Sequence, residues 1–191
     1  MAFFIPQKIE KQLTVIQEAV YREIQEIPVF KFREVCDGEC GEQAAAPAFD
    51  DSAWDDFHVG GLWGGYDVTA WFRAPVAIPS AWQEGRVYLR FLVGPRDSGS
   101  STAETMLYVD GEPLQALDVW HDEAWLPPEV VQRGKIQIAL KAWSGVLDIP
   151  PRRRFARAQL ALIDAASEKL YHVTRVLLDA VRELDENELR R

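Results

Sequence analysis

A short stretch of the chain, residues 109–127, gathers side chains that carry chemistry in many enzymes; it reads VDGEPLQALDVWHDEAWLP. Carboxylates and an imidazole lie close together there, flanked by indoles, and these residues are Asp118, His121, Asp122, Glu123, Trp120 and Trp125. Carboxylates and imidazoles bind divalent metals, and a pair of carboxylates cleaves glycosidic bonds. The stretch therefore raises two hypotheses, a metal site and a sugar-cleaving site.

The spacing of these residues disfavours both kinds of complete site. On a strand, consecutive side chains point to opposite faces, so only His121 and Glu123 would share a side, and two ligands seldom complete a coordination shell. A glycosidase pair lies on either side of a sugar, ~5 Å apart for retention and ~6.5–9.5 Å for inversion, which adjacent residues on one loop rarely achieve. We expect no metal ligand and no catalytic residue here. The pattern favours a loop that makes local hydrogen bonds or contacts a neighbouring domain.

The chain is rich in indoles, with seven tryptophans in 191 residues. Because the faces of aromatic rings stack on apolar surfaces such as those of sugars, this count also suits a domain that handles carbohydrate. Trp71 and Trp143 lie in strand-like runs and are interpreted as packing residues. Trp63, Trp120 and Trp125 lie in predicted loops, where packing and sugar contact both stay open.

Two segments at the ends of the sequence have the apolar spacing of amphipathic helices. In residues 1–28, apolar side chains recur every three or four positions from Gln7 to about Ile27, and Pro28 ends the pattern. In residues 151–191, a stripe that includes Leu160 and continues along the segment predicts a long second helix. A helix of this kind needs a surface to cover, so we interpret the segment as a helical linker.

Residues 29–150 have the pattern of a β-domain. Short runs such as VFKFREV, GRVYLRFLVG and KIQIALKAWSG are separated by turn signals. The Asp110-Gly111 pair inside YVDGEPL is the strongest hairpin signal. Because no helix-length periodic segment interrupts the runs, they predict a mainly β fold, an antiparallel β-sandwich with a helix at each end.

Composition excludes several classes of partner. A net charge of −9 opposes binding to nucleic acid, which needs a basic footprint, and the basic run 152–154 is interpreted as a solvated linker or a helix-start contact. No run approaches the ~20 apolar residues of a membrane span, and the start lacks the features of a signal peptide, so we expect a cytoplasmic protein without a membrane partner. Cys36 and Cys40 lack a second pair of metal ligands and are interpreted as free thiols.

Several phrases in order carry a family resemblance. They are FDDSAW, followed by a WFR strand, an IPSAW turn, a VYLRF strand, LYVDGEPLQALDVWHDEAWLPPE, IALKAWSG and PPRRRFARAQLALID. Together they resemble the N-terminal segment of glycoside hydrolase family 38 α-mannosidases of the cytosolic and vacuolar type, over about residues 49–191. The resemblance implies a lectin-like (galactose-binding-like) jelly-roll that precedes a catalytic domain.

The resemblance implies a parent enzyme that removes α-linked mannose from oligosaccharides with retention, using an aspartate nucleophile and a divalent metal, usually zinc. The family's metal phrase is His-x-Asp-x-x-Trp. In HDEAWLP the imidazole and the acid are adjacent, and the phrase falls within the sandwich, so metal binding is not transferred to His121 or Asp122. Zinc is expected only in the catalytic domain, and this chain by itself is expected to be inactive.

The resemblance therefore implies a non-catalytic domain that supports the catalytic domain of the same polypeptide, in a homo-oligomeric parent. Asp118, Trp120 and His121 are its expected substrate-binding residues, facing the catalytic domain or a mannose-containing oligosaccharide. Two alternatives stay open at this point, a free-standing carbohydrate-binding module and an interaction domain without a ligand.

Overall fold

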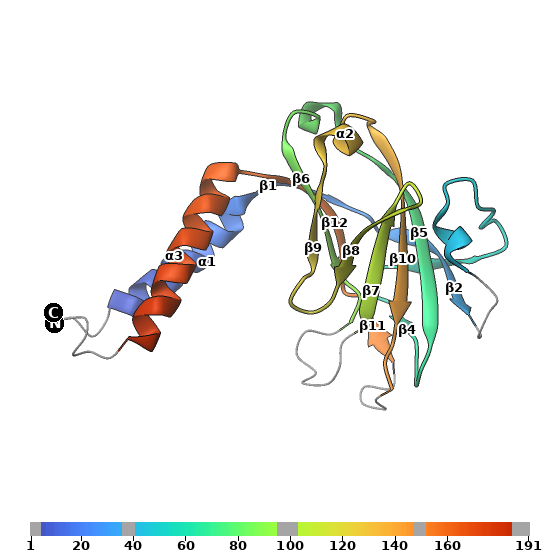
Figure 1. Cartoon of the computed structure of the whole chain (residues 1–191), viewed down its shortest axis with the longest axis horizontal. Helices are drawn as coiled ribbons and strands as arrows, with labels where there is room; N and C mark the ends of the chain where they lie inside the picture. The colour runs from blue at the N-terminus through green and yellow to red at the C-terminus, as the bar shows by residue number, and fades with distance from the viewer. Residues whose placement is uncertain (1–4, 36–40, 95–102, 147–151, 185–191) are drawn as a thin grey trace. The chain divides into compact units, whose positions relative to one another are not determined.

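The structure, a computed structural model, describes residues 5–35, 41–94, 103–146 and 152–184 (Figure 1). The chain divides into two compact units. One unit comprises residues 25–161, and the other combines the segments up to Ile24 and from Leu162 onwards. Cys36 and Cys40, interpreted above as free thiols, lie outside the described residues.

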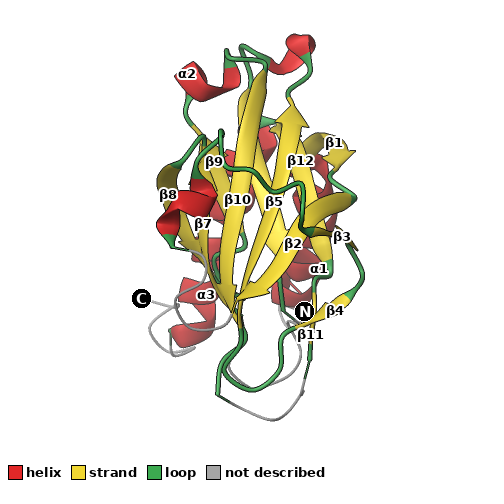
Figure 2. Cartoon of the chain, turned by 90° about the vertical axis from the view of Figure 1, so that its right-hand side faces the viewer, coloured by secondary structure: helices red, strands yellow, loops and turns green. Residues whose placement is uncertain are grey.

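Two antiparallel sheets form most of the fold, as the alternating runs predict. The larger sheet has the order β3 (Asp55–His58), β2 (Val29–Val35), β5 (Thr69–Ala77), β10 (Lys135–Trp143), β7 (Glu104–Val109) and β8 (Glu112–Leu117), and is seen face-on in Figure 2. The smaller sheet has the order β1 (Tyr21–Glu26), β12 (Arg157–Ile163), β6 (Arg86–Leu92) and β9 (Glu123–Leu126).

Short elements complete the sandwich. A two-stranded ribbon pairs β11 (Arg153–Arg154) with β4 (Leu62–Trp63). Single turns of helix lie at η1 (Glu42–Ala45), η2 (Ser80–Trp82) and α2 (Pro128–Val131).

Aromatic side chains fill the space between the two main sheets. Phe72 of β5 lies with its ring centroid 5.1 Å from that of Phe155, which precedes β12, and Phe155 lies 6.5 Å from Phe91 of β6. All three side chains are at most 1% exposed. Edge and tilted aromatic contacts of this kind contribute ~0.5–1.5 kcal/mol each beyond the burial of apolar area. The contacts show that the sheets pack face to face over one core.

The predicted hairpin is confirmed and joins β7 to β8. Asp110 and Gly111 have φ values of 51° and 90°, the left-handed pair that a tight two-residue turn requires. The Asp110 carboxylate accepts hydrogen bonds from the guanidinium of Arg133 at 2.7 Å and from the backbone N–H of Gln137 at 2.8 Å. The turn residue therefore also anchors the hairpin to the neighbouring strand β10.

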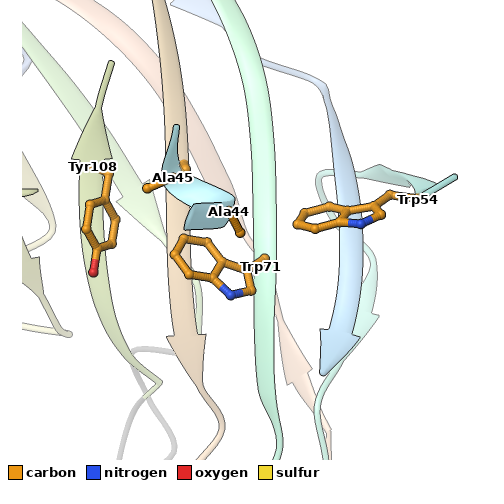
Figure 3. Close-up of a cluster of buried hydrophobic side chains, with 6 residues drawn as sticks. Ala44, Ala45, Trp54, Trp71 and Tyr108 are labelled. Carbon is orange, nitrogen blue, oxygen red and sulfur yellow. The ribbon is translucent and has the colours of Figure 1, made fainter. Parts of the chain in front are cut away.

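A second apolar cluster covers the outer face of the larger sheet. Trp71 and Tyr108 project from β5 and β7 beneath the η1 turn, which contributes Ala44 and Ala45 (Figure 3). Arg73 is 2% exposed and donates to the Asp51 carboxylate at 2.7 Å and to the backbone carbonyl of Ala44. This arginine therefore holds the 41–54 segment against the sheet.

Both predicted helices are shorter than their apolar spacing suggests. The first, α1 (Ile5–Val20), ends before Ile27, because residues 21–26 form strand β1. The second, α3 (Ala165–Glu183), begins after Leu160, which lies in β12 and is fully buried. Asp164 starts α3 as its N-cap by accepting the backbone N–H of Ser167 at 2.8 Å.

Helices α1 and α3 lie side by side and form the second unit (Figure 1). Their contact buries Leu13 and Leu178, and an ion pair joins Arg182 to Glu10 at 2.8 Å. Much of the apolar stripe on α3 remains exposed; Val176, for example, is 67% exposed. Among the described helices, none is long and apolar enough to cross a membrane.

Candidate functional site

The 118–122 loop between β8 and β9 is built around one carboxylate. The Oδ1 atom of Asp118 accepts the backbone N–H groups of Trp120 and His121, both at 2.7 Å, and lies 3.0 Å from Nδ1 of His121. Short polar side chains stabilise turns in this way, by bonding to the backbone two or three residues ahead. The structure therefore brings together all three of the predicted substrate-binding residues.

The same contacts set the electrostatics of Asp118. Partial burial by itself would raise the pKa of this carboxyl. The hydrogen bonds from the His121 and Trp120 backbone, with that of the His121 ring, outweigh burial and hold the pKa below its ordinary value of 3.8. Asp118 is therefore suited to accept hydrogen bonds as a carboxylate, and unsuited to deliver a proton as a general acid.

The other two acids of the cluster belong to a different structure. Asp122 is 7% exposed and accepts a hydrogen bond from the guanidinium of Arg157. Glu123, the first residue of β9, accepts one from Nε of Arg90 at 2.9 Å. Both carboxylates thus tie strands of the smaller sheet together. In the described ranges, no group of three or more His, Cys, Asp or Glu side chains is placed to hold a metal ion, so these residues do not fit a zinc site.

A cavity of about 700 Å³ opens beside the loop, at the end of the larger sheet where β10 stops and β7 begins. We call it the Trp120 pocket. The loop lines it with Asp118, Val119, Trp120 and His121, and the adjoining strands line it with Thr69, Glu104, Thr105, Met106, Ala116, Leu117, Lys141, Ala142 and Trp143. Its volume lies within the ~300–1,000 Å³ range typical of small-molecule sites.

Two indoles differ in how they border this pocket. Trp120 is 84% exposed, which leaves most of its ring open to solvent. Trp143 is half-buried, and its Nε1 donates to the carboxylate of Asp67 at 2.8 Å. With that N–H already bonded, the Trp143 ring offers mainly carbon surface to a ligand. The packing interpretation of Trp143 is therefore incomplete, since the side chain also lines a cavity.

Charged and polar groups complete the pocket wall. Lys141 lies with Nζ 5.9 Å from the ring centroid of buried Trp71, a distance at which an ammonium is attracted to an indole. Glu104 is exposed opposite Trp143 in the pairing of β7 and β10. Thr105 alternates with Glu104 along β7, so its side chain faces the core between the sheets, where the residue is 4% exposed and its hydroxyl has no hydrogen-bond partner among the described residues. Sequence reasoning missed these three residues because strand register alone brings them to the loop.

The remaining tryptophans named as open lie away from the pocket. Trp63 is fully buried and donates its Nε1 to the Val93 carbonyl at 2.9 Å, so it is a packing residue. Trp125 lies in β9 opposite Tyr88 and is 46% exposed on the smaller sheet. It offers an exposed indole of the same chemistry outside the pocket.

Solved structures with a similar fold include several β-glucuronidases. A β-glucuronidase from Bacteroides uniformis matches with a TM-score of 0.53 and 21% identity, over 73% of this chain and 17% of the enzyme. An uncultured Clostridium sp. β-glucuronidase matches with a TM-score of 0.53 and 15% identity, over 75% of this chain and 29% of the enzyme. One from Ruminococcus gnavus, in complex with N1-substituted uronic isofagomine, has a TM-score of 0.52 and 12% identity, over 75% and 30%.

At these identities the likeness shows the fold alone, and the chain spans less than a third of the length of each of these enzymes. Comparison with curated proteins gave no match. The model of a protein family described as "Alpha-mannosidase, jelly roll domain" matches residues 34–175, which include every strand from β3 to β12 and most of α3. The chain therefore belongs to the family of α-mannosidase jelly-roll domains.

Proposed function

We propose that this chain is a non-catalytic domain of a retaining, metal-dependent α-mannosidase that hydrolyses α-mannosides in oligosaccharides. Its role is to support the catalytic domain of the same polypeptide. Membership of the jelly-roll family is the observation that carries the proposal. The zinc, or another divalent metal, that the family implies would be held by the catalytic domain. Among the described residues of this chain, no group of three or more acids, cysteines or histidines is placed to bind it.

The chemistry of the candidate site supports a non-catalytic role. Glycoside cleavage needs one carboxyl kept protonated near neutral pH, which requires a raised pKa. The pKa of Asp118 is shifted in the opposite direction, and Asp122 and Glu123 accept hydrogen bonds from arginines. The acids of the 109–127 stretch are thus engaged in holding a loop and a sheet.

Turnover by the isolated chain tests the first half of the proposal. The 191-residue chain is incubated with an aryl α-mannoside, with and without added zinc or cobalt, and release of the aryl group is followed. We expect no release above the rate in buffer. Release that depends on the chain, and that is lost when Asp118 is replaced by Asn, would show that this domain is itself catalytic.

Removal of residues 25–161 from the parent polypeptide tests the second half. We expect the catalytic domain to unfold at a lower temperature without this domain, since it loses a packed neighbour. An unchanged melting temperature together with unchanged turnover would contradict the supporting role. We also propose that the parent is a homo-oligomer in the cytoplasm, which light scattering of the purified enzyme and cell fractionation would check.

A free-standing carbohydrate-binding module is the second candidate, and the exposed Trp120 beside a cavity favours it. In that case the isolated chain would bind sugar without a catalytic partner. Titration of the isolated chain with mannose or mannobiose tests this candidate, and the deletion described above tests the supporting role.

A further inference from the structure

We propose that the Trp120 pocket binds a neutral sugar, one or two pyranose units long, with Trp120 and Trp143 supplying the apolar contacts. The choice of an α-mannoside as the ligand rests on the proposed function; the preference for a neutral, hydroxyl-rich ligand rests on the pocket alone. Three features of the pocket carry the inference: a preorganised indole, a second indole with its N–H satisfied and a balanced set of charges.

The exposed indole of Trp120 stands on an ordered loop. Two hydrogen bonds to Asp118 fix the backbone at residues 120 and 121, and a third contact holds the His121 ring, so binding does not have to order the loop first. A large apolar side chain that is 84% exposed gains by covering its ring. The apolar face of a pyranose is a surface that an indole can cover without hiding the hydroxyl groups.

Trp143 provides carbon surface on another side of the same pocket. Its Nε1 hydrogen bond to Asp67 holds the ring in place and leaves the indole N–H unavailable to a ligand. Two aromatic rings that border one cavity favour a ring-shaped ligand with apolar faces over an extended polar chain.

The charges around the pocket offer ionic ligands no net attraction. Glu104 and Asp118 are acidic, and Lys141 is basic, so the wall has carboxylate acceptors and an ammonium donor with little excess of either sign. A phosphate or a uronic acid would be attracted by one ammonium and repelled by two carboxylates. Sugar hydroxyls both donate and accept, and so match both kinds of group.

The test follows the indole N–H signals of the ¹⁵N-labelled 191-residue chain by NMR during titration with methyl α-mannoside, α-linked mannobiose and glucuronic acid. Each signal is assigned from single Trp→Phe variants. We expect saturable shifts of the Trp120 and Trp143 signals with the mannosides, a stationary Trp125 signal, and a Kd for glucuronic acid at least about tenfold weaker. The absence of a saturable shift with either mannoside would overturn the proposal, and so would equal binding of glucuronic acid.

Two matched variants test whether the sugar contacts Trp120. Trp120→Ala is expected to weaken mannobiose binding by about tenfold or more, as judged by ligand-observed NMR, because it removes a stacking face. Trp125→Ala removes an exposed indole of the smaller sheet and is expected to change the Kd by less than about twofold. Circular dichroism confirms that both variants fold. Equal weakening by the two variants, or none by Trp120→Ala, would refute the site.

Failure here is distinguishable from failure of the proposed function. If the mannosides do not bind but deletion of the domain still lowers the melting temperature of the parent enzyme, the site is refuted and the supporting role stands. If the sugar binds but the deletion changes nothing, the site stands and the supporting role is refuted.

Discussion

Arg73 joins strand β5 of the larger sheet to the 41–54 segment that covers the outer face of that sheet. Its guanidinium is 2% exposed, donates to Asp51 and to the Ala44 carbonyl, and lies 5.3 Å from the ring centroid of Phe49. These contacts join β5 to three positions of the 41–54 segment. Replacing Arg73 with Met keeps most of the apolar stem and removes every one of the charged contacts.

The expected loss of stability in Arg73→Met comes from the polar groups that the substitution leaves without their partner. Breaking a buried ion pair costs ~3–5 kcal/mol, but the Asp51 side chain is 27% exposed and can regain water, so the lower end applies. The carbonyl of Ala44, a residue that is 0% exposed, loses a charged donor, which adds a smaller penalty. We expect Arg73→Met to lower the free energy of unfolding by ~3 kcal/mol, a large part of the ~5–15 kcal/mol typical of a domain.

Urea unfolding at 25 °C, followed by circular dichroism, measures this loss. Arg33→Met is the matched control, because Arg33 lies on the neighbouring strand β2 and is exposed, and it should change the free energy by less than about 0.5 kcal/mol. Amides of the 41–54 segment should exchange faster with solvent in Arg73→Met. A loss below about 1 kcal/mol, or one equal to that of Arg33→Met, would refute the role assigned to Arg73.

Three further predictions concern the loops and the ribbon. Gly64→Ala should cost ~1–3 kcal/mol in urea unfolding, since Gly64 has a φ of 72° and an added Cβ would lie 2.8 Å from the Cβ of Ser144. Trp63→Phe should cost ~1–2 kcal/mol in the same assay, because the Val93 carbonyl loses its donor. Because the pKa of Asp118 is lowered on folding, its contribution is complete above the ordinary value of 3.8 and is lost as the pH falls through the folded value. The NMR signal of the Trp120 indole N–H should therefore shift below about pH 4 in the unsubstituted 191-residue chain and stay constant in Asp118→Asn.

The strands and the hairpin were predictable because their signals are local. Alternation in VFKFREV corresponds to β2, and the left-handed pair that Asp110-Gly111 favours is the one observed. The ends of the two long helices were not predictable in the same way. Ile24 and Ile27 continue a helical spacing from α1, yet residues 21–26 are extended in β1, beside β12 in the smaller sheet. A short window cannot register a partner strand more than 130 positions away.

The residues of the candidate site also separate into those that local sequence signals predict and those that only the pairing of distant strands brings together. Asp118, Trp120 and His121 were found from the sequence because one side chain orders the next three residues, and that interaction is local. Glu104 and Trp143 were not found, since they meet only through the register of β7 and β10. What sequence reasoning lacked was thus the pairing of distant strands.

The boundary between the 118–122 loop and β9 divides the acids of this stretch into two sets with different partners. On the loop side, Asp118 accepts only neutral or weakly basic donors from its own turn and stays open to the Trp120 pocket. Asp122, the last residue of the loop, accepts a hydrogen bond from Arg157 of β12, and Glu123, the first residue of β9, accepts one from Arg90 of β6. Acids that bond to arginine have acceptor positions occupied, which disfavours metal binding. Adjacent acids therefore serve different purposes, one group ordering a pocket wall and the other joining strands.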